Sequence, residues 1–141
     1  MINSKYAPIN VGEYGTKDLN LNYQGTSGTV PKGTTTNIDF LITGDHLVDG
    51  GEIISSGAVM GDKFTIMIVD KDNVLGYGLN VVLNQFITNW FVDPVSPRWG
   101  FTSSYPAKLY SGLYVRLIFT SIGTVNDVTV AINMGLHKVL W

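Results

Sequence analysis

Two aspartates, Asp70 and Asp72, lie two residues apart where an apolar run ends in the sequence VDKDN. Carboxylates at this spacing on a loop can share a hard cation such as Ca²⁺, which takes about six to eight oxygen ligands. Asp62, and Asp45 or Asp49 from neighbouring loops, could supply further oxygens. The segment lacks the glycine and the distal glutamate of an EF-hand loop. A hairpin turn uses Asp and Asn equally well for side-chain hydrogen bonds to its own backbone. We expect this turn, with calcium binding as the alternative.

Catalytic motifs are missing from the sequence. Its two histidines are His46 and His137. No serine lies in a G-x-S-x-G elbow, and the glycines form neither a dinucleotide-binding nor a P-loop pattern. Two histidines without clustered carboxylates give little support for a metal site. We expect His46 in a turn, His137 on the outward face of the last strand, and no enzymatic activity.

The segment from Trp90 to Tyr110, WFVDPVSPRWGFTSSYPAKLY, combines three prolines with many aromatic side chains. Pro94 and Pro97 predict that a strand ends near Val92. A long loop is expected to follow, from Pro94 to Pro106. Aromatic residues and arginine are enriched at binding hot spots, which favours a contact surface here.

The interface predicted from this segment and from the apolar C-terminus consists of Trp90, Arg98, Trp99, Phe101, Tyr105, Tyr110 and Trp141. Two alternatives stay open for the aromatic residues. They could fold back and cap the end of the domain's own core, or they could stack on sugar rings.

Length and composition exclude several classes of protein. The 141 residues suit one domain. Charged residues make up 14%, against a usual share of about 25%. The nine Lys and Arg residues are scattered, so a nucleic-acid partner is not expected. No apolar run approaches the roughly 18 residues of a membrane helix, and the N-terminus lacks the apolar region of a secretory signal. We therefore expect neither a membrane partner nor secretion.

The dominant pattern is alternation of apolar and polar residues with a period of two, which is typical of strands with one face in a core. It covers residues 36–42, 64–68, 113–120 and 128–137. Turn formers separate the runs, including Val48–Glu52 and Ile122–Asp127, the latter predicted to be a hairpin loop between the last two strands. These signals predict an all-β fold, an antiparallel, jelly-roll-like β-sandwich over residues 19–141, preceded by an irregular N-terminal arm over residues 1–18. An edge strand is expected to begin near Leu19.

Residues 79–90 fit either a helix or a strand, and the β-branched and aromatic content favours the strand. Both of its faces would be largely apolar, which suits a central strand or one that another subunit covers. Arg116 falls on the outward face of its strand. We expect it to pair with an acid on a neighbouring strand or across a subunit boundary.

Three segments, MGDKFTIMIVDKDNVLG, WFVDP and YPAKLYSGLYVRLIFTSIGTVNDVTVAINMGLHK, together resemble a pattern in small structural proteins of tailed-phage virions. The resemblance covers roughly residues 35–138. The matching residues are Gly61, Asp62, Asp70, Lys71, Asp72, Gly112, Leu113, Tyr114, Arg116, Ser121 and Gly123. These are fold and turn residues, so the resemblance implies no active site. It implies a β-sandwich building block of a particle, such as a capsid decoration, head-fibre or neck and tail component.

Composition and resemblance together predict a non-enzymatic virion structural protein without a cofactor, made in the host cytoplasm and located in the virion. We expect it to self-associate as a closed homo-oligomer such as a trimer, and to dock on other virion proteins of a capsid or tail. The alternative is a carbohydrate-binding or calcium-dependent C2-like module. That module would use Trp99, Phe101 and Tyr105, or Asp70 and Asp72.

Overall fold

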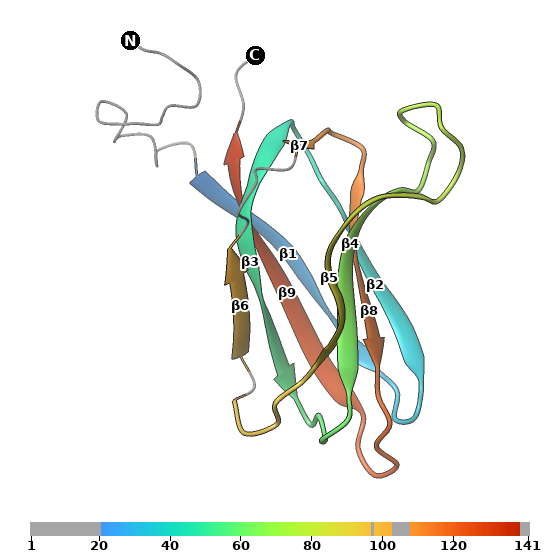
Figure 1. The fold of residues 1–141 in the computed structure, drawn as a ribbon, viewed down its shortest axis with the longest axis vertical. Coiled ribbons are helices and arrows are strands. Elements are labelled where there is room, and N and C mark those ends of the chain that lie inside the picture. Colours follow the sequence, from blue (N-terminus) through green and yellow to red (C-terminus); the bar gives the residue numbers. More distant parts are fainter. Residues whose placement is uncertain (1–20, 97, 103–107, 139–141) are drawn as a thin grey trace.

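The computed structural model describes residues 21–96, 98–102 and 108–138, and these residues form two antiparallel β-sheets (Figure 1). The strands are β1 (Leu21–Val30), β2 (Thr35–Leu41), β3 (His46–Ser56), β4 (Lys63–Asp70), β5 (Val81–Phe91), β6 (Arg98–Thr102), β7 (Lys108–Leu109), β8 (Tyr114–Thr120) and β9 (Val128–Lys138). One sheet has the order β1-β9-β3-β6, with β7 also paired to β3, and the other has the order β2-β8-β4-β5. Across the described ranges, no helix is long and apolar enough to cross a membrane.

The strand order is that of a jelly roll. Successive strands pass from one sheet to the other, except that β4 and β5 follow each other in one sheet and β6 and β7 both pair with β3. Two such sheets packed face to face form the double Greek-key sandwich. The predicted fold class, an antiparallel jelly-roll-like β-sandwich, is confirmed.

The hairpin predicted at Ile122–Asp127 is wrong. β8 pairs with β2 and β4, whereas β9 pairs with β1 and β3, so residues 122–127 connect the two sheets. Turn-forming residues between two strands of alternating apolar and polar residues give the same sequence pattern whether the strands pair with each other or belong to different sheets. The sequence signal therefore could not distinguish a hairpin from a connection that crosses the sandwich.

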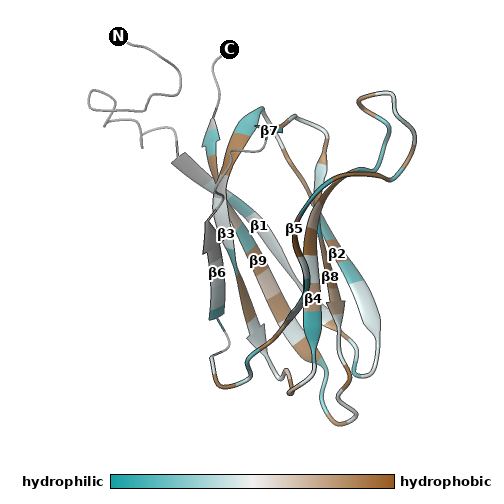
Figure 2. Cartoon of the chain, viewed as in Figure 1, coloured by the Kyte–Doolittle hydropathy of each residue, from teal (hydrophilic) through white to brown (hydrophobic). Residues whose placement is uncertain are grey.

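The core lies between the sheets and follows the predicted alternation. Figure 2 shows hydrophobic residues along β4 and β9. The inward side chains of β8 and β9 are almost completely buried: Val115, Leu117, Phe119, Val128, Val130, Ile132, Met134 and Leu136. Each large apolar side chain that is fully buried stabilises the fold by roughly 1.5–3 kcal/mol.

Strand β3 is longer than the sequence suggested. The turn predicted at Val48–Glu52 is wrong, because these residues belong to the strand. The register with β9 shifts between Val48 and Gly50, so a bulge accommodates the Asp-Gly-Gly sequence without ending the strand. His46 is also misplaced by the prediction. It begins β3 and is only 2% exposed, and its Nδ1 atom lies 3.0 Å from the carbonyl oxygen of Gly44.

The outward face of the second sheet carries an ion pair that the sequence predicted. Arg116 on β8 donates two hydrogen bonds of 2.9 Å to the carboxylate of Asp39 on β2. This hydrogen bonding raises the pKa of Arg116, although burial opposes the shift. The strand-to-strand pairing expected for Arg116 is confirmed.

The inward face of β4 begins with a buried acid. Asp62 directly precedes the strand and is fully buried. Its carboxylate accepts hydrogen bonds from the backbone N–H groups of Val59, at 3.1 Å, and Ile122, at 2.8 Å. Asp62 therefore ties the β3–β4 loop to the β8–β9 connection.

Replacing Asp62 with alanine should lower the free energy of unfolding by roughly 2–4 kcal/mol, because two buried N–H groups lose their acceptor. Urea denaturation measures this change. The control is Asp72→Ala, at an exposed position, which should stay within about 0.5 kcal/mol of the wild type. Equal stability of the two variants would contradict the assigned role of Asp62.

Candidate interaction surfaces

The predicted metal ligands Asp70 and Asp72 lie at the end of β4 and have different surroundings. Asp70 is fully buried, and its two carboxylate oxygens accept hydrogen bonds from the backbone N–H groups of Val74, at 2.7 Å, and Leu75, at 2.8 Å. Asp72 is exposed. In the part of the chain that the structure describes, no three His, Cys, Asp or Glu side chains gather as metal ligands would. The geometry at Asp70 is that of a side chain fixing the backbone of the turn.

Residues 71–80, which we call the β4–β5 loop, project beyond the ends of the strands (Figure 1). Their backbone is held by local contacts as well as by Asp70. The side-chain oxygen of Asn73 accepts a 2.8 Å hydrogen bond from the N–H of Gly78. Asn73 and Asn80 have φ angles of 61° and 57°, and Gly76 and Gly78 also have positive φ. Asparagine and glycine are the residues that adopt this conformation at low cost.

The β4–β5 loop exposes four apolar side chains. Their exposed fractions are 50% for Val74, 36% for Leu75, 75% for Tyr77 and 71% for Leu79. Four exposed apolar side chains within one ten-residue loop are a candidate for an interaction site, because large exposed apolar patches mark such sites. The sequence pattern does not identify these residues, because it predicts a turn at Lys71–Asn73 and a strand that already includes Leu79. The alternation of Asn and Gly with apolar residues in NVLGYGLN was the available signal.

Cations lie at the base of the loop. The Nζ atom of Lys71 is 5.1 Å from the centre of the Tyr114 ring and 3.9 Å from the carboxylate of Asp39. The same carboxylate binds Arg116. Two cations therefore share one carboxylate beside the apolar loop, and Asp72, the next residue in the loop, adds an exposed acid.

The opposite end of the sandwich also exposes apolar residues. They come from the β3–β4 loop and the β8–β9 connection, which Asp62 ties together: Val59, Met60, Ile122 and Val125. Their exposed fractions reach 81% for Met60 and 76% for Val125. Both ends of β4 thus hold an apolar loop in place through a buried aspartate.

Within the loop predicted from Pro94 to Pro106, Arg98–Thr102 forms strand β6, so the prediction is wrong for these residues. β6 pairs with β3 from Gly50 to Ile54. The strand has only five residues and follows a proline, so its sequence signal is weak. It forms because the edge of β3 offers hydrogen-bond partners to its backbone. Trp99 lies directly opposite the buried Ile53 and therefore faces the core.

Trp99 closes the side of the sandwich between β5 and β6. Its ring centre is 5.4 Å from that of the buried Phe64, at an interplanar angle of 67°, and 5.6 Å from that of Trp90. The edge-to-face contact with Phe64 adds about 0.5–1.5 kcal/mol beyond the area it buries. Trp90 itself is 50% exposed. The three rings form a continuous path from the core to solvent.

The predicted interface residues therefore divide into two groups. Trp90 and Arg98 are exposed, and a guanidinium nitrogen of Arg98 lies 3.7 Å from the carboxylate of Glu52. Trp99 and Tyr110 pack against the core, as the capping alternative required. The structure describes only the backbone of Phe101, and Tyr105 and Trp141 lie outside the described residues.

Residues 81–91 form a strand, as predicted, but β5 is an edge strand, so the central-strand alternative is wrong. Its register with β4 shifts at three places. These bulges direct Leu83, Phe86 and Ile87 toward the core, although they are not spaced two apart. The apolar character of both faces follows from this irregular inward set together with the exposed Trp90 and Phe91.

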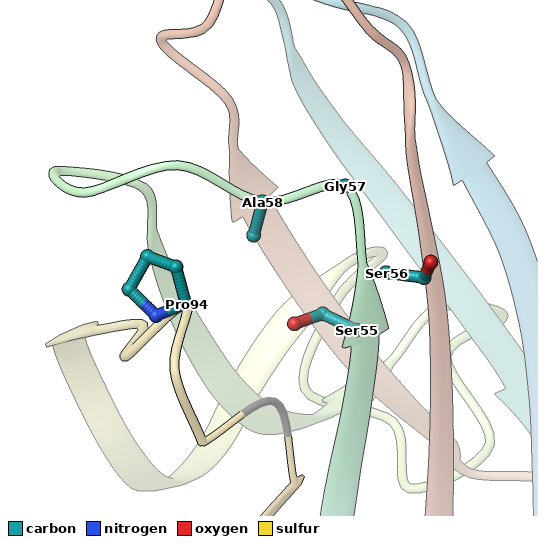
Figure 3. A pocket seen from close by; sticks show the side chains of 5 residues that line it. All are labelled: Ser55, Ser56, Gly57, Ala58 and Pro94. Carbon is teal, nitrogen blue, oxygen red and sulfur yellow. The ribbon is translucent and has the colours of Figure 1, made fainter.

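A small pocket lies where β3 extends past β6 (Figure 3). Its lining consists of Ser55, Ser56, Gly57, Ala58 and Pro94, and its volume is about 240 Å³. Ligand pockets usually measure about 300–1,000 Å³. Among the described residues that line it, none has an ionisable side chain.

No family model and no curated protein sequence matches the chain. Solved structures with weak similarity to it include the following two. PliG of Aeromonas hydrophila, a periplasmic inhibitor of g-type lysozyme, is 8% identical with a TM-score of 0.36, over 82% of this chain and 86% of that chain. VP2 in the subviral particle of infectious bursal disease virus is 10% identical with a TM-score of 0.28, over 84% and 42% of the two chains. Similarity this low carries no argument about function.

Trp99→Ala should lower the free energy of unfolding by about 3–5 kcal/mol, because it removes a large ring that packs on the core. Trp90→Ala should cost much less, since half of that side chain is already in water. Chemical denaturation of both variants measures the difference. A Trp99→Ala protein as stable as the wild type would contradict the capping role and favour the interface predicted from sequence.

Proposed function

We propose that the chain is a non-enzymatic structural subunit that self-associates. In this proposal, the β4–β5 loop is the surface that docks on other proteins of a particle. The observation that carries this proposal is the loop itself, where four exposed apolar side chains stand on a backbone fixed by the buried Asp70. The particle is a virion in this proposal, as the resemblance to structural proteins of tailed phages implies.

The fixed conformation of the β4–β5 loop lowers the conformational entropy that is lost when the loop binds a partner. Burial of apolar surface stabilises a complex by about 25 cal/mol per Å². Ordering a flexible loop on binding would oppose this by roughly 1–2 kcal/mol per residue of backbone. Because Asp70 and Asn73 already hold the loop, less of the binding energy is lost to ordering.

The chemistry of the loop also describes the surface it fits. Tyr77 is the most exposed of the four side chains, and tyrosine is among the residues that dominate binding energy. Lys71 and Arg116 share a single carboxylate at the base of the loop. A partner surface with an apolar centre would complement the loop, and a rim that carries both signs of charge would complement Lys71 and Asp72.

The described carboxylates support a structural role rather than catalysis. Asp39 and Glu52 pair with arginines, and Asp72 is exposed. Five more acids accept hydrogen bonds from backbone N–H groups: Asp45, Asp62, Asp70, Asp93 and Asp127. Carboxylates engaged in this way stabilise turns and loops. They are not arranged as general acids or bases.

Mass spectrometry of purified, washed virus particles tests the virion location. Peptides of this chain should be present at a fixed ratio to the major capsid protein. Their absence from intact particles would rule out the proposed location.

Tyr77→Ser combined with Leu79→Ser should abolish incorporation into particles without unfolding the protein. Both side chains are mostly exposed, so each change should alter stability by only about 0.5 kcal/mol. Val95→Ser is the matched control, because Val95 lies outside the β4–β5 loop and its side chain is 88% exposed. This variant should be incorporated normally. Normal incorporation of the double variant would overturn the proposed role of the loop.

A glycan-array screen and a calcium titration address the rival binding module. A glycan ligand, or a melting temperature that rises by several degrees with calcium, would favour that module over the structural subunit. The proposal expects neither response.

A further inference from the structure

Strand β1 is an open edge of the first sheet. It pairs with β9 through ten consecutive positions, from Leu21 opposite His137 to Val30 opposite Val128, without a register shift. In the sheet order of the described residues, no strand lies on its other side. A regular edge of this length presents unpaired backbone groups to any second strand.

The other edge strands are protected in ways that β1 is not. β5 is interrupted by three register shifts, and β6 has only five residues. β2 has seven residues, one of which is Asp39 in its ion pair. β1, with the sequence LNYQGTSGTV, has no bulge, no proline and no charged residue. Bulges, short length and charges are the features by which proteins prevent pairing at sheet edges.

Contacts with β2 and the residues after it keep β1 in place. The side-chain amide of Gln24 donates to the carbonyl oxygen of Thr43 at 3.2 Å and accepts from the N–H of Thr43 at 3.3 Å. Gly28 lies so close to Ile38 that a Cβ atom there would be 3.2 Å from that side chain. The open edge is therefore a fixed template that needs no ordering before a second strand pairs with it.

We propose that β1 pairs with β1 of a second copy of this chain, antiparallel about a two-fold axis, so that two sheets become one. Of the edges that the chain offers, β1 provides the longest uninterrupted ladder for such pairing. Because β1 has no charged residue, no like charges meet across the axis. Main-chain hydrogen bonds would supply the affinity, and a two-fold interface closes on itself.

The side chains on β1 are compatible with this arrangement. Tyr23, Ser27 and Thr29 lie on the outward face and are exposed. Gly25 between them is also exposed, but a Cβ atom there would meet Ile132 and Asn133 of β9, so this position requires glycine. Antiparallel pairing that keeps outward residues opposite outward residues places mainly small side chains along the new seam. The inference rests on the self-association in the proposed function. It specifies a dimer, where the sequence suggested an oligomer such as a trimer.

Sedimentation or light scattering at micromolar to millimolar concentration tests the pairing. The wild-type chain should form a dimer. Ser27→Lys combined with Thr29→Lys places cations along the seam of both copies and should raise the dimer dissociation constant roughly tenfold or more. Thr35→Lys combined with Asn37→Lys makes the same charge change on exposed positions of β2 and should leave the dimer intact. A monomeric or trimeric wild type, or equal dissociation constants, would overturn the inference.

Hydrogen exchange of the wild-type protein locates the interface without any variant. As the concentration rises, amides of Leu21–Val30 that do not bond to β9 should exchange more slowly, and those of β5 should not change. Protection at β5 instead of β1 would overturn the inference.

The two proposals fail separately. Tyr77→Ser with Leu79→Ser should remain dimeric, because it leaves β1 unchanged. A wild type that forms another oligomer, such as a trimer, and still enters particles would overturn the β1 pairing alone, whereas a monomeric wild type would also overturn the self-association in the proposed function. A dimeric wild type that enters particles regardless of the loop variant would overturn the loop proposal alone.

Discussion

The two buried carboxylates at the ends of β4, Asp62 and Asp70, hold the loops that expose apolar side chains at both ends of the sandwich. A carboxylate without water is unstable unless hydrogen bonds replace its solvation. Asp62 and Asp70 obtain those hydrogen bonds from backbone N–H groups of neighbouring loops. The loops must therefore adopt conformations that bring their amides to the strand. The apolar side chains that these loops expose are held in position by the same bonds.

Closure of the sandwich follows a different rule at each side. Between β5 and β6, aromatic rings fill the space, with Trp99 packed between Phe64 and Trp90. Between β1 and β2, the amide of Gln24 and the absence of a side chain at Gly28 bring the two strands close together. The side between β5 and β6 is therefore closed by large aromatic side chains next to the bulged strand β5. The side between β1 and β2 is closed by the short distance between the two strands, and β1 keeps an uninterrupted register with β9.

Alternation along the chain was sufficient to predict the fold class, because a strand with one face in a core must place apolar residues at every second position. Ile38, Phe40 and Ile42 on one strand segment, and the inward residues of β9, follow that rule. The pairing of Arg116 with an acid was predictable for the same reason, since a charged residue opposite a buried face needs a partner. Strand order was not predictable, because turn formers do not say which sheet the next strand joins.

The candidate site was predicted only in part. Trp90 and Arg98 lie on the surface as expected, but Trp99 packs inward because β6 pairs with β3, a long-range contact that proline-rich sequence conceals. The exposed apolar residues of the β4–β5 loop were not predictable, because the loop is ordered by positive φ angles at Asn73, Gly76, Gly78 and Asn80 and by the buried Asp70. Sequence alone does not show that Asp70 is buried.

The length of β4 has a consequence for any assembly built from this chain. Asp62 and Asp70 are eight residues apart on an extended strand, which corresponds to roughly 26 Å at about 3.3 Å per residue. The apolar loops that they anchor are therefore separated by a distance that the strand fixes. Adding two residues to β4 would keep its inward face but lengthen this distance by roughly 7 Å. The repeat distance of an assembly that contacted both ends would then be set by a single strand.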